Sequence, residues 1–247
     1  MNIRSFIYAS VTGFILLLSL ALPASANTVS VDFADGFGMT EQAVQIIALI
    51  TILSLAPSIL IMVTSFVRIA VVLSLLRTAL GVQQSPPNSV IISLSLFLTA
   101  FVMAPVFETA YETGIAPLIN EEIEIGEAFT TSSKPFHAFM LTQVRDKDLQ
   151  LFMDMSKSET VENPEDIPLQ VLVPAFMISE LKRAFEIGFL IFVPFIVIDM
   201  VVASVLMSMG MMMLPPIIIS LPFKLIFFVL VDGWHLITGS LVQSFGT

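Results

Sequence analysis

Long apolar stretches dominate the pattern of this chain, and each one ends at a proline-rich turn or at a polar segment. Written as a helix, the first stretch would extend about 57 Å, almost twice the ~30 Å hydrocarbon core of a bilayer. The pattern therefore predicts helices that are kinked, split or partly wrapped in protein. The apolar stretches are Ala43 to Leu80, Ser89 to Phe107, Val171 to Leu214 and Ile217 to Leu241.

Two pairs of adjacent prolines divide these stretches into helical hairpins. Proline lacks a backbone donor and clashes with the preceding turn, so a helix ends before each pair. We therefore expect a first hairpin over residues 43–107 and a second over residues 171–247, with a turn at each pair. The turn prolines are Pro86 and Pro87, and Pro215 and Pro216.

Between the two hairpins the chain becomes polar and acidic. Residues 108–170 contain thirteen acidic and four basic residues. Within this block, the segment from Pro135 to Ser156 places apolar residues at mostly helical spacing, which predicts one amphipathic helix. We expect a soluble, mostly helical block on the outer side of the membrane.

The amino terminus has the pattern of a secretory signal peptide over residues 1–26. Arg4 precedes an apolar run, and small residues follow it, which predicts cleavage after Ala26. The alternative, an uncleaved membrane helix, is disfavoured because the run has about a dozen residues where ~20 are needed to span a bilayer. Residues 27–42 would then form a short periplasmic segment of a bacterial protein.

The composition supports an all-α membrane protein. Hydrophobic residues make up 56% of the 247 residues, charged residues only 12%, and the mean hydropathy is +0.96. The net charge of -10 disfavours nucleic-acid binding, and the absence of cysteine excludes disulfides and cysteine-bound metals. Because we find no catalytic, phosphate-binding or metal-binding pattern, we expect no enzyme, no cofactor and no metal.

Three charged residues, Arg68, Asp199 and Lys224, lie inside apolar stretches. An unpaired charge there costs at least ~2.5 kcal/mol, so each should face protein or water. Counted from the second turn, Asp199 lies about 15 residues before it and Lys224 about 9 after it, an offset of ~9 Å in straight helices. Direct pairing would need a kink or a neighbouring subunit. We favour a pair that holds an assembly together over a proton relay.

A methionine cluster precedes the second proline pair. Consecutive positions on a helix point ~100° apart, so the cluster is not a packing stripe, and Gly210 with Pro215 favours a loop or a broken helix end. Thioether side chains are unbranched and adaptable. Two interpretations stay open, namely apolar filler beside a turn and a deformable constriction that lines a pore. The methionines are Met209, Met211, Met212 and Met213.

Three long segments, Ser65 to Asn88, Pro174 to Pro216 and Leu221 to Leu241, are similar to the FliP family, the P subunits of the flagellar type III export gate. Virulence injectisomes have a related subunit, but the signal peptide and the segment before Ala43 resemble the flagellar branch. The resemblance implies a pentameric helical spiral with the Q and R subunits. It places this assembly within the basal-body ring of the inner membrane, largely at periplasmic level, with the hairpins packed against one another.

The same resemblance implies roles for individual residues. The four methionines match the family's gasket around unfolded flagellar proteins in transit, and Asp199 and Lys224 match its buried acid and lysine. It also implies a structural subunit without catalysis, whose energy comes from elsewhere in the apparatus. The competing hypothesis is a small-solute or ion transporter, motivated by proline-broken helices and buried charges. The acidic block and the lack of a polar substrate site at the broken helices disfavour it.

Overall fold

The computed structural model describes residues 39–246, apart from residue 83, residues 157–162 and residues 212–213. The expected signal peptide with Ala26, and residues 27–38, lie outside the described residues. The described residues form helices and no strands, which confirms the all-α prediction. The helices are α2 (Met39–Met62), α3 (Phe66–Leu80), α4 (Asn88–Ala110), α5 (Ala116–Ile119), α6 (Ile125–Gln143), α7 (Asp146–Ser156), α8 (Leu169–Ser208), α9 (Pro216–Leu230) and α10 (Gly233–Gln243).

The chain divides into two units, Met1–Ile52 and Leu53–Thr247. Of the first unit, the structure describes only the beginning of α2, whose residues 43–52 are exposed. The overlong first apolar stretch is split, as predicted, because α2 ends at Met62 and α3 begins at Phe66. The break does not lie at Pro57, which is inside α2.

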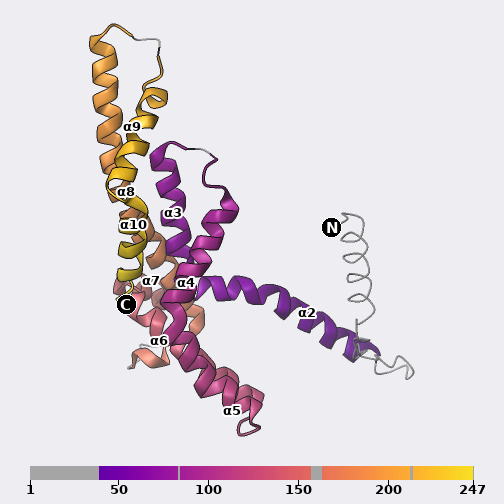
Figure 1. The fold of residues 1–247 in the computed structure, drawn as a ribbon. Coiled ribbons are helices and arrows are strands. Elements are labelled where there is room, and N and C mark those ends of the chain that lie inside the picture. The colour runs from indigo at the N-terminus through magenta and orange to yellow at the C-terminus, as the bar shows by residue number, and fades with distance from the viewer. Residues whose placement is uncertain (1–38, 83, 157–162, 212–213, 247) are drawn as a thin grey trace, which may run out of the picture. The chain divides into compact units, whose positions relative to one another are not determined.

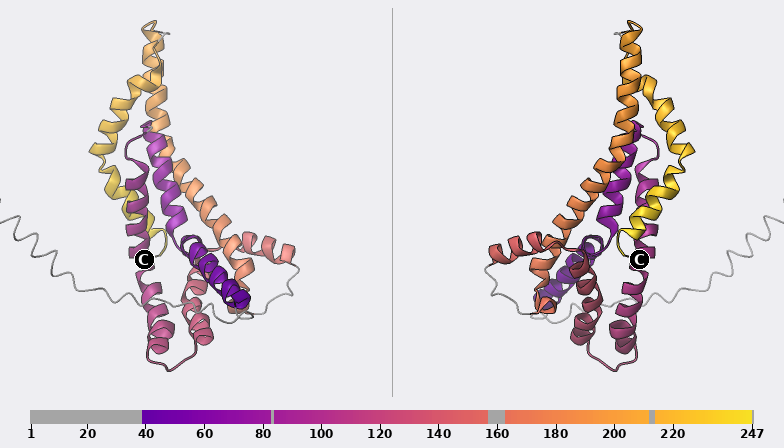
Figure 2. Two further views of the ribbon diagram at one scale, coloured as in Figure 1. Left: turned by 90° about the vertical axis from the view of Figure 1, so that its right-hand side faces the viewer. Right: turned by 90° about the vertical axis from the view of Figure 1, so that its left-hand side faces the viewer.

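The second unit contains two helical hairpins, α3 with α4 and α8 with α9 (Figure 1). The turn between α3 and α4 contains Pro86 and Pro87, and Arg77 holds it by donating to Asn88 Oδ1 at 2.6 Å and to the Pro86 carbonyl at 3.3 Å. Helix α8 is continuous for 40 residues, about 60 Å, and its tip with α9 extends beyond the α3–α4 turn (Figures 1 and 2).

The fourth apolar stretch is not one helix. It bends by 63° between α9 and α10, where Asp232 adopts a left-handed backbone conformation with φ 49°. Gly233 follows directly beneath the ring of Phe228, and a Cβ at this glycine would lie 2.2 Å from that ring. The bend thus brings Gly233 against a side chain five residues earlier in the chain, a local packing detail that hydropathy alone does not reveal.

The acidic block is built on a continuation of α4. This helix passes residue 107 without a break, enters a π-helical turn (Tyr111–Ile115) and continues as α5, after which α6 returns alongside it (Figure 2). The two arms touch at Gly114, where a Cβ would lie 2.0 Å from Ser132 Oγ. We call residues Glu108–Gln143 the distal hairpin.

The prediction of one amphipathic helix from Pro135 to Ser156 is wrong. Helix α6 ends at Gln143, Val144 is extended with ψ 145°, and α7 begins at Asp146. The Arg145 backbone N–H donates instead to Ser179 Oγ of α8 at 3.1 Å, so a contact with another helix replaces a bond within the predicted one. After residue 162, a short 3₁₀ turn (Pro164–Asp166) leads into α8.

Helix α3 lies at the centre of the second unit, between α4 and α8 (Figure 1). Ile69, Val72 and Leu76 are fully buried, whereas large apolar side chains such as Phe97 remain exposed on the outside. Among the described residues, α2, α8 and the continuous segment Asn88–Ile119 contain windows long and apolar enough to cross a membrane, and the bent pair of α9 and α10 would be a fourth span. The exposed apolar surface fits a membrane location or contacts with other subunits.

Candidate functional site

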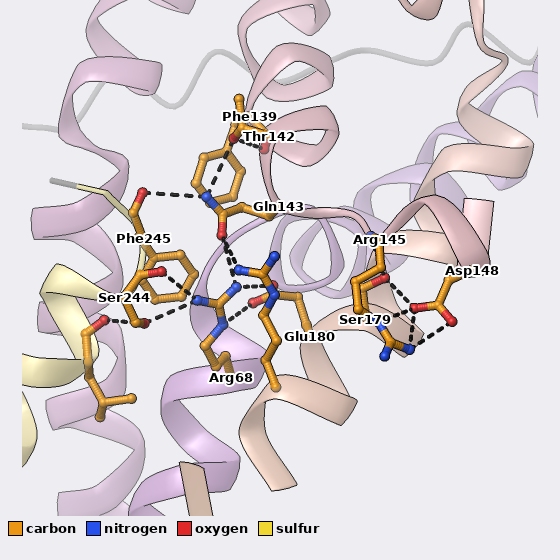
Figure 3. A network of polar contacts seen from close by, with 12 residues as sticks. Arg68, Phe139, Thr142, Gln143, Arg145, Asp148, Ser179, Glu180, Ser244 and Phe245 are labelled. Atoms are coloured by element: carbon orange, nitrogen blue, oxygen red, sulfur yellow. Dashed lines mark hydrogen bonds and ion pairs between the residues drawn. The ribbon is translucent and has the colours of Figure 1, made fainter. Parts of the chain in front are cut away.

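A buried ion pair joins α3 to α8 near the middle of the second unit (Figure 3). Arg68 and Glu180 are both 0% exposed. Arg68 Nε donates to Glu180 Oε2 at 2.9 Å, and Nη2 donates to the other carboxylate oxygen, so the contact is bidentate. Such geometry is required if a pair of charges is to be tolerated in a dry interior.

The remaining donors of Arg68 reach α6 and the end of the chain (Figure 3). Nη2 donates to Gln143 Oε1 at 3.0 Å, and Nη1 donates to the carbonyl and the hydroxyl of Ser244, both at 3.1 Å. The guanidinium lies 3.8 Å from the centre of the Phe245 ring. One side chain therefore connects four segments, and the sequence indicated Arg68 but not its partners.

A second charged pair joins α8 to α9. Lys224 Nζ donates to Asp199 Oδ2 at 2.6 Å and to the Ala79 carbonyl of α3 at 3.4 Å, and Ser220 donates to Asp199 Oδ1 at 2.5 Å. The lysine side chain is 5% exposed and the aspartate side chain 31%. The pair thus forms within one chain, whereas the axial offset had called for a kink or a neighbouring subunit.

The reason is where α8 ends. The offset assumed a helix that runs to Pro215, but α8 ends at Ser208. Asp199 is then about nine residues from the end of its helix and Lys224 about eight from the start of α9, or about 13 and 12 Å along the two axes. The loop takes up the difference, and the two side chains lie at the same level.

The loop that joins α8 to α9 carries the methionine cluster. Gly210 has φ +75°, a left-handed conformation that suits glycine and ends a helix. Met209 and Met211 are exposed, as is Met207 in the last turn of α8. Met212 and Met213 lie outside the described residues. Met207, Met209 and Met211 thus lie at a helix end and a turn and are not part of the core.

A third polar cluster attaches α7 to α8 (Figure 3). Arg145 Nε and Nη2 donate to the two carboxylate oxygens of Asp148, each at 2.8 Å, and Ser179 donates to Asp148 Oδ2 at 2.6 Å. Burial raises the pKa of Asp148, but the hydrogen bonds from Ser179 and Arg145 outweigh it and hold the pKa below its ordinary value.

We expect the attachment of α7 to weaken in acid. A carboxyl group whose pKa is lowered in the folded state adds stability above its unfolded pKa, about 3.9, and this stability is lost as the pH falls through the folded value. The protection factors of α7 amides, that is, their exchange rates relative to an unfolded chain at the same pH, should therefore fall below about pH 4 in the original chain. In Asp148→Asn the fall in protection over this pH range should be much smaller, and an equal fall in both chains would contradict the assignment.

These clusters can brace helices, but they do not form an evident catalytic centre. Among the described residues, no group of three or more His, Asp or Glu side chains could hold a metal ion. His137 Nε2 lies 2.8 Å from the Ile167 carbonyl and links α6 to the segment before α8. The arrangement favours packing of helices and an adaptable loop over bond-making chemistry.

Comparisons with known proteins agree on one family. The model described as the FliP family matches residues 49–241. A flagellar biosynthetic protein FliP of Caulobacter vibrioides is 64% identical over 227 residues, which are 91% of this chain and 85% of that protein. The proteins of the same name from Bacillus subtilis and Rhizobium meliloti are 56% and 48% identical, over 83% and 95% of this chain and 93% and 98% of theirs.

Proposed function

The chain belongs to the FliP family of flagellar biosynthetic proteins, and we propose that it is a pore-forming structural subunit of the flagellar export gate. As a family member it is a component of flagellar protein export. The finer role is passage of unfolded flagellar proteins across the inner membrane, through a channel to which this subunit contributes the loop between α8 and α9. The subunit performs no catalysis itself.

The observation that carries this proposal is the exposure of thioethers at the end of α8. Met207, Met209 and Met211 are 63%, 62% and 43% exposed in the isolated chain. Unbranched side chains can close on one another and also repack around passing side chains of many shapes. Apolar side chains at a constriction exclude water and ions when no chain is in transit. A gasket needs both properties.

The proposed setting is an oligomer at the inner membrane. Several copies, together with the Q and R subunits, would form a spiral within the basal-body ring, largely at periplasmic level. The exposed apolar side chains of α4, α8 and α9 support this, because a single chain without partners would leave these side chains in water. The Arg68 and Lys224 pairs would keep each subunit rigid while its neighbours pack on it.

Deletion of the gene tests the export role. We expect the deletion strain to assemble no filaments while its cytoplasmic flagellin is still made, because export fails after synthesis. Electron microscopy of the cell surface and immunoblots of cytoplasm and medium measure both. A plasmid copy of the original chain is the control and should restore filaments. Normal filaments in the deletion strain would contradict the proposal.

A further inference from the structure

The distal hairpin exposes a set of large apolar side chains although it is the acidic, polar part of the chain. Ile125 and Phe129 are 79% and 73% exposed, more than most apolar side chains of the apolar helices. Packing within the chain leaves these side chains exposed, so the reason for their apolar character must be sought in contacts outside the chain. The exposed apolar residues of the hairpin are Tyr111, Ile115, Ile119, Ile125 and Phe129.

Helical spacing places these residues on one side of the hairpin. Gly114 faces Ala128 and Ser132 across the contact between the two arms. In a helix, each residue lies about 100° further round the axis than the residue before it. Ile115 therefore lies about 100° from the inward-facing Gly114, and Phe129 lies about 100° from the inward-facing Ala128. Because the arms are antiparallel, equal rotations bring both to the same side. We call this set of five residues the apolar face of the distal hairpin.

A bilayer does not explain the apolar face. The exposed side of α4 continues from Phe97 and Phe101 to Glu108 and Glu112 at helical spacing, so apolar surface gives way to acids there. The continuous segment Asn88–Ile119 has 32 residues, about 48 Å, which exceeds the ~30 Å hydrocarbon core. The end of the hairpin would project into water, where an apolar face rimmed by polar residues marks a protein contact.

Charge indicates what kind of protein fits. The distal hairpin has one base, Lys134, among its acids. Two copies meeting through this same face would bring like charges together. Two bases elsewhere on the described surface have acids nearby, since Lys147 lies between Asp146 and Asp148 in the sequence and Lys182 pairs with Glu186 at 3.2 Å. The acids of the hairpin are Glu108, Glu112, Glu121, Glu122, Glu124 and Glu127.

We propose that the apolar face of the distal hairpin docks a different protein, whose contact surface has an apolar centre and a rim of lysine and arginine residues. The apolar centre supplies most of the affinity, and the acids of the hairpin orient the partner and speed its encounter. This inference uses only the distal hairpin and holds whether or not the methionine loop seals a pore.

Photo-cross-linking in living cells tests it. The photoreactive residue p-benzoylphenylalanine replaces Ile119, Phe129 or, as a control on the opposite side of the hairpin, Thr113. We expect Ile119 and Phe129, but not Thr113, to cross-link to one other protein, identified by mass spectrometry, with lysine or arginine flanking the cross-linked apolar site. Unchanged thermal unfolding of each purified variant in detergent is the check on folding.

Charge reversal provides the second arm. Glu121→Lys with Glu124→Lys should reduce the cross-linked yield at Phe129 severalfold, whereas Asp154→Lys on α7 should leave it unchanged. The proposal is overturned by cross-links to a second copy of the chain, to another part of the same chain or to lipid. It is also overturned by yields no higher than at Thr113, by a partner site without bases, or by no effect of the charge reversal.

Discussion

Replacing Arg68 with alanine should destabilise the chain by about 3–5 kcal/mol, because the change leaves a fully buried carboxylate without its partner. Glu180 is 0% exposed, and the same substitution removes donors to Gln143 and Ser244. Thermal unfolding in detergent measures the loss, and reduced accumulation in the membrane should accompany it.

Two further variants separate the buried charge from general damage. The double variant Arg68→Met with Glu180→Met removes both charges and should recover part of the loss, since apolar pairs often replace buried ion pairs. Lys182→Ala breaks the exposed pair with Glu186 and should change stability by no more than about 1 kcal/mol. If Arg68→Ala is as stable as the original chain, the pair does not brace the helices.

Replacing Met211, Met212 and Met213 together by alanine should make cells that express the complete gate leak small ions. Alanine removes most of the side-chain volume that would fill the closed constriction, so water and ions could enter. Loss of potassium and growth in high salt are suitable measurements. The increase in ion permeability should be large, because an open channel passes more ions than leak through an intact membrane.

The matched control changes methionines away from the loop. Met155 of α7 and Met200 of α8 are 68% and 67% exposed and can be replaced by alanine without touching the loop. We expect no leak from this variant at equal amounts of gate. Unchanged permeability in the loop variant would remove the gasket role while leaving membership of the export apparatus intact.

The sequence predicted the helices and their turns well, because these depend on local signals. Apolar runs marked the long helices, and the proline pairs marked both hairpin turns. Two breaks inside predicted helices were missed. At Val144 the backbone is extended and its neighbour Arg145 bonds to Ser179 of another helix, which no local pattern indicates. At Asp232 the bend depends on how closely Gly233 packs against the Phe228 ring, which hydropathy does not report.

The charged residues show the same limit. Burial of Arg68 and Lys224 followed from their apolar surroundings, but 112 residues separate Arg68 from Glu180, and nothing local indicates that pairing. For Asp199 and Lys224 the error was one of length, since the offset counted residues of the loop as helix. The functional role of these pairs and of the methionines stays a prediction.

The contacts of Arg68 also set an order of events during synthesis. Ser244 lies 176 residues after Arg68 in the chain. The contacts between them therefore cannot form until the second hairpin has been synthesised, and until then the first hairpin waits with part of its guanidinium unsatisfied. The core around α3 is in this sense completed by residues of the second hairpin.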